Sequence, residues 1–306
     1  MTRRAFVLFA LMSVIWGIPY LLIRVAVAEI SPATLVFART GIAALILLPI
    51  AVARLDLRPV LARWRWVVAC AAVEVGIPWF LLSSAEERVT SSLAGLLVAG
   101  VPLVGMIIAV VTRGRDRVGG VAFLGLLVGL AGVAAIVDVN ADASNAGALV
   151  EIAIVVVGYA AGPAILARRL GDLPSLGVMA VSLSLCALVY APLAAAQRPV
   201  VMPAADVLVA VAILGVVCTA AAFLCFAALI DEIGPVRATV ITYVNPAVAA
   251  VLGVVVLNEP FTVAMVAGFA LVILGSALAT RQPRPAGVAG SVGPQLAPAE
   301  EEEPAA

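Results

Sequence analysis

Ten apolar stretches of about 20 residues constrain this chain more than any other feature. A stretch of that length crosses a hydrocarbon core roughly 30 Å thick as one helix, whereas the strands of a membrane β-barrel alternate apolar and polar side chains. The loops between them are too short to fold as a soluble domain. We therefore predict an all-α integral membrane protein whose function is built from its helices. The predicted spans are residues 5–24, 33–53, 66–84, 90–111, 118–137, 148–167, 175–195, 207–229, 236–256 and 262–280.

The composition excludes several kinds of chemistry. Hydrophobic residues make up 64% of the chain and charged residues 12%, against roughly 45–50% and 25% in soluble domains. The 18 basic residues are all arginine, which removes histidine metal ligands, histidine bases and Schiff-base lysines. The four cysteines fall inside predicted spans without the spacing of metal ligands. We expect no catalytic residue, no metal and no cofactor.

The arginines predict the orientation, because short cytoplasmic loops carry an excess of positive charge. With the N-terminus in the cytoplasm, 14 of the 18 arginines fall on the cytoplasmic side. We therefore expect a multi-pass membrane protein with both termini in the cytoplasm. Those arginines are Arg3, Arg4, Arg54, Arg58, Arg63, Arg65, Arg113, Arg115, Arg117, Arg168, Arg169, Arg237, Arg281 and Arg284.

A shift of 143 or 144 residues aligns the two halves of the chain. We predict a first repeat over residues 1–137 and a second over 148–280, followed by a disordered cytoplasmic tail over 281–306 that is rich in Pro, Ala, Gly and Glu. Five helices per repeat require the second copy to enter the membrane from the opposite side, so the repeats are expected to be inverted. That architecture is typical of alternating-access carriers. The aligned pairs are Pro49 and Pro192, Pro102 and Pro246, Gly125 and Gly268, Gly132 and Gly275, and Trp16 and Tyr159.

Five stretches resemble one known family when they are taken in order. They are "SVIWGIPYLLIRVA", "SPATLVFARTGIAALILLP", the helix with Pro102, "YVNPAVAAVLGVVVLNEP" and "GFALVILGSAL". Together they resemble the drug/metabolite transporter superfamily, specifically its EamA-type ten-helix members. The resemblance covers about residues 5–280. It implies an inner-membrane carrier of small metabolites, often an exporter of amino acids or related compounds, with a cavity between the repeats. It does not indicate the substrate.

Two charged side chains near mid-membrane are candidates for the substrate or proton pathway, because ionisable groups there are costly unless they have a function or a partner. Glu74 lies in the middle of the third span and suits a proton-coupled step or recognition of an amine. The alternative is a protonated glutamic acid that bonds a neighbouring helix. Arg39 could attract a substrate carboxylate or pair with Glu74 or Glu151. The alternatives are that it snorkels outward or ties two helices together.

Aromatic and helix-breaking residues complete the candidate set. Trp16 and Tyr159 fall near mid-span at equivalent positions and are expected to line the cavity. Tyr243 is a further candidate for the substrate or proton pathway, and the alternative is a place in the aromatic belt at the membrane interface. Pro102 and Pro246 are expected to bend the fourth and ninth helices at equivalent places, with Asn245 beside the second bend. In the outer turn "NEP", Glu259 is expected to be mainly structural, at the start of the tenth helix.

The sequence thus predicts a secondary transporter that moves a small organic solute, such as an amino acid, an amine or a drug-like compound, by alternating access. We expect efflux driven by protons. A gradient-independent facilitator or exchanger remains an alternative, and an intramembrane lipid-modifying enzyme is a more distant one. The expected partners are the small-molecule substrate, protons as the coupling ion and the lipid bilayer, with no nucleic acid. A homodimer is compatible with the sequence.

Overall fold

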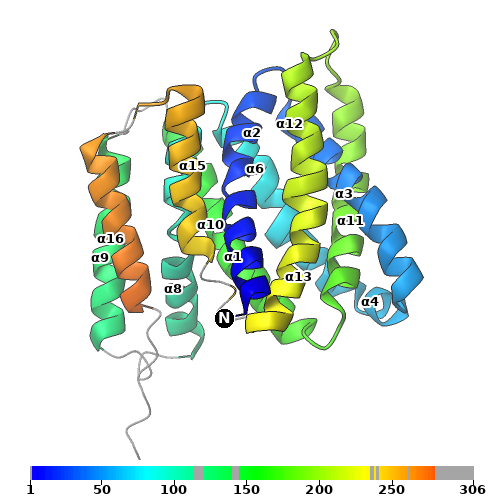
Figure 1. Ribbon diagram of the computed structural model, residues 1–306, viewed down its shortest axis with the longest axis horizontal. Helices are drawn as coiled ribbons and strands as arrows, with labels where there is room; N and C mark the ends of the chain where they lie inside the picture. The colour runs from blue at the N-terminus through cyan, green and yellow to red at the C-terminus, as the bar shows by residue number, and fades with distance from the viewer. Residues whose placement is uncertain are drawn as a thin grey trace, which may run out of the picture.

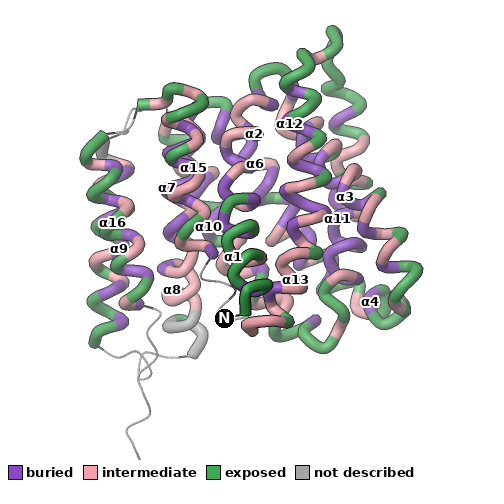
Figure 2. The backbone as a smooth tube through the Cα atoms, in the orientation of Figure 1, coloured by how far each residue is buried: buried purple, intermediate pink, exposed green. Residues whose placement is uncertain are grey.

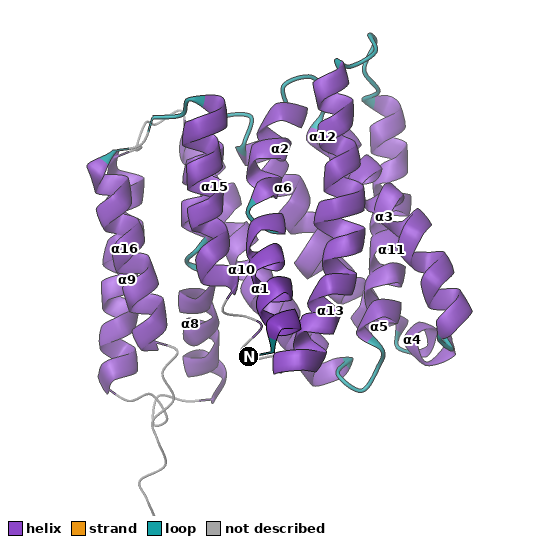
Figure 3. Cartoon of the chain, in the orientation of Figure 1, coloured by secondary structure: helices purple, strands orange, loops and turns teal. Residues whose placement is uncertain are grey.

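The computed structural model describes residues 2–113, 120–139, 145–234, 238, 241–260 and 262–279. The predicted tail at 281–306 lies outside these residues. Within the described ranges the protein is all-helical, without strands, and short loops join the helices (Figures 1 and 3). The helices are α1 (Arg3–Ile15), α2 (Ile18–Ala26), α3 (Pro32–Arg54), α4 (Arg58–Ala62), α5 (Trp64–Cys70), η1 (Ala71–Gly76), α6 (Ile77–Ala85), α7 (Ser91–Val98), α8 (Val101–Arg113), α9 (Gly120–Val139), α10 (Ala146–Arg169), α11 (Ser175–Ala196), α12 (Ala205–Gly215), η4 (Val216–Ala221), α13 (Ala222–Ile233), α15 (Ile241–Leu257) and α16 (Val263–Ala279).

Eight helical segments in the described part are long and apolar enough to cross a membrane. Two shorter apolar helices, Ile241–Leu257 and Val263–Ala279, stand where the ninth and tenth spans were predicted. Large apolar side chains such as Leu45 and Val255 point outward, and exposed positions cover the outside of the bundle (Figure 2). This outer surface fits a lipid environment, in which apolar side chains need no burial. The eight segments are Arg3–Ala26, Pro32–Arg54, Trp64–Ala85, Ser91–Ile108, Gly120–Val137, Ala146–Arg169, Ser175–Ala196 and Ala205–Ile233.

The two prolines predicted to bend equivalent helices are placed differently. The fourth span divides at Ala99 and Gly100, and Pro102 follows as the second residue of α8, where a missing backbone N–H costs nothing. Pro246 instead lies inside the continuous helix α15. The first span also divides, at Trp16 and Gly17 between α1 and α2. The predicted symmetry of the two prolines is therefore not reproduced in helix structure.

The helices pack in defined pairs (Figure 1). Helix α9 packs along α16, α3 along α11, and α7 along α15. Helix α10 packs along α6, while α2 and α1 pack against α12 and α13. Two neighbouring clusters of buried apolar side chains fill the space between these pairs, and Tyr159 packs against both.

Glycines allow the closest of these contacts, between α9 and α16. A Cβ atom added at Gly125 would lie 2.4 Å from the backbone nitrogen of Ala279, and one at Gly275 would lie 2.2 Å from that of Gly129. One at Gly132 would lie 2.6 Å from the carbonyl oxygen of Gly268. Membrane helices approach this closely only where side chains are small. The four aligned glycines therefore share one helix interface, where Gly125 lies against Gly275 and Gly132 against Gly268, each beside the other pair's member and not beside its own aligned partner.

Candidate functional site

Two π-helical segments interrupt the third and eighth spans. The segment η1 covers Ala71–Gly76 and η4 covers Val216–Ala221, so their starts are 145 residues apart, close to the shift that aligns the halves. A π-helical turn is rare, often marks a functional site, and re-aims side chains by widening the turn. Hydropathy carries no signal for such a turn, and sequence reasoning missed both segments. Each of them holds a polar side chain of the candidate site.

Glu74 lies in η1 and faces α10. Its side chain is half-buried, but its Oε2 atom is buried and has no hydrogen-bond partner among the described residues. A Cβ atom at Gly162 of α10 would lie 1.9 Å from Oε2 and 2.8 Å from the Cβ of Glu74. The carboxyl group therefore occupies space that exists because residue 162 has no side chain. The expected alternative, a glutamic acid bonded to a neighbouring helix, is not seen at Oε2.

Arg39 is buried where three helical segments meet. Its Nε atom donates to Thr219 Oγ1 of η4 at 2.9 Å, and its guanidinium group lies 3.6 Å from the ring centre of Trp79 in α6. The Thr219 hydroxyl in turn donates to the Leu214 carbonyl at 2.7 Å. In the described part of the chain Arg39 pairs with neither carboxylate that the sequence offered. It ties α3 to η4 and α6 and does not snorkel outward.

The two aromatic residues predicted to line a cavity occupy matching places. The Trp16 ring contacts Phe226 at 4.7 Å and Phe223 edge-on at 6.3 Å, both from the eighth span. The Tyr159 hydroxyl interacts with the Trp79 side chain in the third span. Tyr159 also lies one turn before Gly162, the residue against which Glu74 rests. Both side chains are half-buried. A shift of 144 places Trp79 on Phe223, so the repeat alignment could have identified both contacts.

Asn245 ties α15 to the broken first span. With its amide nitrogen oriented as the donor, it bonds the carbonyls of Ile241 at 2.9 Å and Ser13 at 3.1 Å. A Cβ atom at Gly17 would lie 2.9 Å from the Asn245 carbonyl oxygen and 2.5 Å from the Val248 side chain. The Asn-Pro pair thus lies against the Trp16–Gly17 break. The neighbouring Tyr243 is half-buried.

Glu259 of the "NEP" turn caps a helix other than the one expected. Its Oε1 accepts from the Ser91 backbone N–H at 2.8 Å and the Ser91 hydroxyl at 2.9 Å, and its Oε2 accepts from the Ser92 N–H at 2.8 Å and its hydroxyl at 2.5 Å. A carboxylate at a helix N-terminus is stabilised by the free N–H groups and the helix dipole. The helix is α7, which begins at Ser91, and not α16. Asn258 makes the turn possible with φ of 53°.

Glu86 is a buried acid that sequence reasoning did not single out. It follows α6, is fully buried, and neither carboxyl oxygen has a partner among the described residues. Burial raises the pKa of the Glu86 carboxyl well above its usual range, and the charge of Glu259 raises it further. The Arg24 guanidinium bonds the Glu86 carbonyl, and Arg88 pairs with Glu151 nearby. Arg24 and Glu151 thus join neighbouring helices at this end of the bundle.

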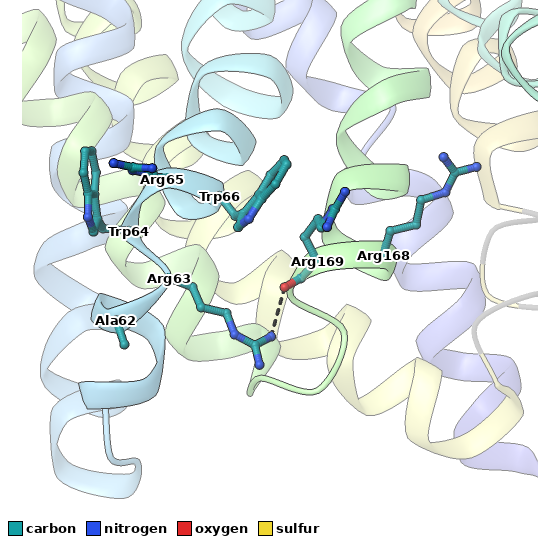
Figure 4. Close-up of a pocket in the computed structure, with 7 residues that line it drawn as sticks. All are labelled: Ala62, Arg63, Trp64, Arg65, Trp66, Arg168 and Arg169. Carbon is teal, nitrogen blue, oxygen red and sulfur yellow. Dashed lines mark hydrogen bonds between the residues drawn. The ribbon is translucent and has the colours of Figure 1, made fainter. Parts of the chain in front are cut away.

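Hollows open at opposite ends of the bundle. One, of about 380 Å³, lies beyond α2 and includes three acidic residues and one arginine: Arg24, Glu29, Asp206 and Glu259. The other, of about 570 Å³, is basic and lies at the end that holds the N-terminus, where α5 begins and α10 ends (Figures 1 and 4). In the described residues no group of His, Cys, Asp and Glu is arranged to hold a metal ion.

Apolar helices that enclose buried polar residues and present apolar side chains outward define a multi-pass membrane protein. The chain belongs to the EamA-like transporter family, whose sequence profile matches residues 3–138 and 147–281. This match confirms the resemblance and shows two repeats of the family in the chain. A search of curated proteins gave no match. A solved structure titled "Crystal structure of protein" is 22% identical with a TM-score of 0.64, over 90% of this chain and 96% of that one, and so shares the fold.

Proposed function

We propose that this chain is a secondary transporter that exports a small organic solute across the inner membrane by alternating access, coupled to protons. Family membership supports a transporter with a small-molecule substrate in a bilayer. The observation that carries the proposal is Glu74, whose buried Oε2 has no partner in the described residues and lies in a π-helical turn of the third span. A carboxyl group placed in this way can take up and release a proton as its surroundings change.

The packing supports inverted repeats over residues 1–137 and 148–280. Numbering the spans from one to ten, the second pairs with the seventh, the fourth with the ninth and the fifth with the tenth. The first pairs with the eighth and the third with the sixth. If each span is replaced by its counterpart in the other repeat, the first by the sixth, the second by the seventh and so on, every one of these packed pairs again becomes a packed pair. A two-fold relation between the repeats produces this pattern, and it gives the two similar shapes that alternating access requires.

The charges support the orientation. The end of the bundle that holds the N-terminus also holds α4 (Figure 1) and the arginines around it, and the opposite hollow is lined by three acids. An excess of arginine marks a cytoplasmic face. This distribution of charge supports the proposal that the N-terminal end of the bundle faces the cytoplasm.

The residues around Glu74 suggest an amino acid or amine as the substrate. Glu74 rests against Gly162 of α10, three residues along that helix from Tyr159, and Arg39 lies over the Trp79 ring of α6. An acidic, a hydroxyl and a basic group are therefore carried by the third, sixth and second spans where these spans pack together. An ammonium group would be recognised by Glu74 and a carboxylate by Arg39. Trp16 and the nearby phenylalanines would bound the apolar part of the solute on the side of the eighth span.

The test is flux of a panel of labelled amino acids and amines in proteoliposomes, with and without an imposed pH gradient. We expect gradient-driven flux of at least one solute by the wild type. Glu74→Gln keeps the shape of the side chain but cannot release a proton, so its flux should fall to the level reached without a gradient. Glu87→Gln makes the same change at an exposed position and serves as the control.

Unchanged flux and pH dependence in Glu74→Gln would remove Glu74 from the mechanism. Flux by the wild type that ignores the gradient would instead identify a facilitator or exchanger. No observation in the described part of the chain favours an intramembrane enzyme.

A further inference from the structure

A basic pocket lies where the third and sixth spans end. It is formed by the start of α5 and the end of α10 and encloses about 570 Å³ (Figure 4). The proposed transport site does not use it. Its lining residues are Ala62, Arg63, Trp64, Arg65, Trp66, Arg168 and Arg169.

The pocket carries more positive charge than its own structure neutralises. Arg63 donates to both carboxylate oxygens of Asp172, at 2.5 and 2.7 Å, and to the Arg169 carbonyl at 3.0 Å. This ion pair joins the α4–α5 corner to the loop after α10. In the described part of the chain no carboxylate pairs with Arg65, Arg168 or Arg169. These three guanidinium charges thus have no carboxylate partner there, and Arg65 and Arg168 lie at opposite sides of the pocket with Arg169 between them (Figure 4).

Two tryptophans set the depth of the pocket in the bilayer. Trp64 is 59% exposed and Trp66 is 40% exposed, although both begin an apolar span. Exposed tryptophans at the end of a span lie at the level of the lipid headgroups. Arg169 lies 4.5 Å from the Trp66 ring centre and Arg65 lies 5.6 Å from that of Trp64. The aromatic rings therefore hold the two guanidinium groups at headgroup level (Figure 4).

The surface beside the pocket is apolar. Leu61 of α4 is 56% exposed and Val68 of α5 is 43% exposed. An anion that also carried acyl chains could cover these side chains while its phosphate met the arginines. A small soluble anion could use the charge alone.

We propose that the basic pocket binds the phosphate headgroup of an anionic glycerophospholipid. Basic pockets between membrane helices suit such headgroups, and a phosphate oxygen pair matches the planar guanidinium fork. The bound lipid would bridge α5 and α10. These two helices lead to Glu74 and Gly162, so the lipid would fix the ends of the helices whose middles meet at the proposed transport site.

The test is native mass spectrometry of the full-length protein in detergent, titrated with phosphatidylglycerol or phosphatidylcholine. We expect the wild type to prefer phosphatidylglycerol. The Arg65→Gln/Arg169→Gln variant should bind it about 25-fold more weakly, at roughly fivefold per arginine removed. Arg54→Gln/Arg58→Gln removes two exposed arginines of the same end that do not line the pocket, and it should bind like the wild type.

Several results would overturn the proposal. Equal binding of the two lipids would remove the role of headgroup charge, and equal losses in the two double variants would show a diffuse effect of the whole face. Displacement of the lipid by inorganic phosphate at matched concentration would assign the pocket to a soluble anion. If the pocket variant does not elute as a folded protein, Arg168→Gln alone provides the test, with an expected loss of about fivefold. No loss there would equally contradict the proposal.

Discussion

The π-helical segments η1 and η4 occupy equivalent places in the two repeats but hold their polar side chains in opposite ways. In η4, the Thr219 hydroxyl accepts from Arg39 and donates to Leu214, so both of its hydrogen-bonding functions are used. In η1, Glu74 keeps a buried oxygen without a partner in the described residues and rests against a glycine of the next helix. A π-helical turn thus holds the hydrogen-bonded Thr219 in the second repeat and the Glu74 Oε2 atom, unpaired within the described ranges, in the first.

The contrast between Thr219 and Glu74 assigns η4 to stability and η1 to transport. A buried polar group without a partner costs free energy, whereas a satisfied one stabilises the fold. The η4 segment is therefore expected to fix the packing of the second, third and eighth spans. The η1 segment is expected to retain a group that can take a proton or a ligand during transport. Substitutions that break the Arg39–Thr219 contact should accordingly lower stability, whereas substitutions at Glu74 should lower transport.

The largest effect on stability is expected for Arg39→Ala. It removes a hydrogen bond from a charged donor and a cation–π contact and leaves a cavity, and should lower the free energy of unfolding by about 2–4 kcal/mol. Thr219→Val should cost about 1–2 kcal/mol. Chemical denaturation in detergent measures both values.

A double-mutant cycle tests whether these two residues act together. We expect the combined loss to be smaller than the sum of the single losses, because both remove the same bond. Arg39→Lys keeps the charge but not the planar guanidinium group, so its free energy of unfolding should lie between those of the wild type and Arg39→Ala. Strict additivity would show that η4 is not held by this contact.

The next effect is expected for Gly162→Ala. The new Cβ atom would overlap the Glu74 carboxyl and approach its Cβ, and overpacking of this kind costs about 1–3 kcal/mol. It should also reduce transport by moving Glu74. Gly41→Ala is the matched control, because a Cβ atom there meets nothing within 4 Å, and its unfolding free energy and flux should equal those of the wild type. Wild-type flux in Gly162→Ala would show that the position of Glu74 is not critical.

The spans and their packing glycines could be predicted because both depend on local composition. Where the predicted ends fall on described residues, they lie within about four residues of the observed helix ends, since apolar length in a bilayer fixes where a helix runs. Gly125 and Gly275 could be assigned to packing because a glycine in a membrane helix has few other uses.

The details of the site could not be predicted because they depend on contacts between distant segments. Hydropathy does not distinguish a π-helical turn from an α-helical one, so η1 and η4 were missed. The cap that Glu259 forms on α7 joins residues 168 positions apart. Gly162 gains its meaning only from Glu74 on another helix. Glu74 and Arg39 were identifiable because an isolated charge within an apolar stretch is a strong signal, but their partners were not.

Glu86, directly after the third span, provides a pH test that separates its own effect on stability from the effect of Glu74 on transport. Its pKa is raised above the ordinary value of 4.5 by burial and by Glu259. Above pH 4.5 the unfolded chain releases this proton while the folded protein retains it, so stability falls as pH rises through that range. Glu86→Gln removes the titration and should raise the melting temperature at neutral pH and reduce its dependence on pH. Glu87→Gln, at an exposed position, should change the melting temperature and its dependence on pH less than Glu86→Gln does.

The flux of Glu86→Gln completes that test. If Glu74 is the transport carboxyl, the pH dependence of flux should survive in Glu86→Gln and disappear in Glu74→Gln. The reverse result would move the proton site from η1 to the C-terminal end of α6.

The smallest effect on stability is expected for Glu74→Gln, even though its effect on transport should be complete. The wild-type carboxyl already lacks a partner at Oε2, so a neutral amide of the same shape gives up no bond. The change in the free energy of unfolding should stay within about 0.5 kcal/mol, in contrast to the loss expected for Arg39→Ala. Chemical denaturation of Glu74→Gln and Arg39→Ala in the same detergent measures both free energies of unfolding. A loss of several kcal/mol for Glu74→Gln would mean that η1, like η4, is a structural contact, and the two segments would then differ in residue type but not in role.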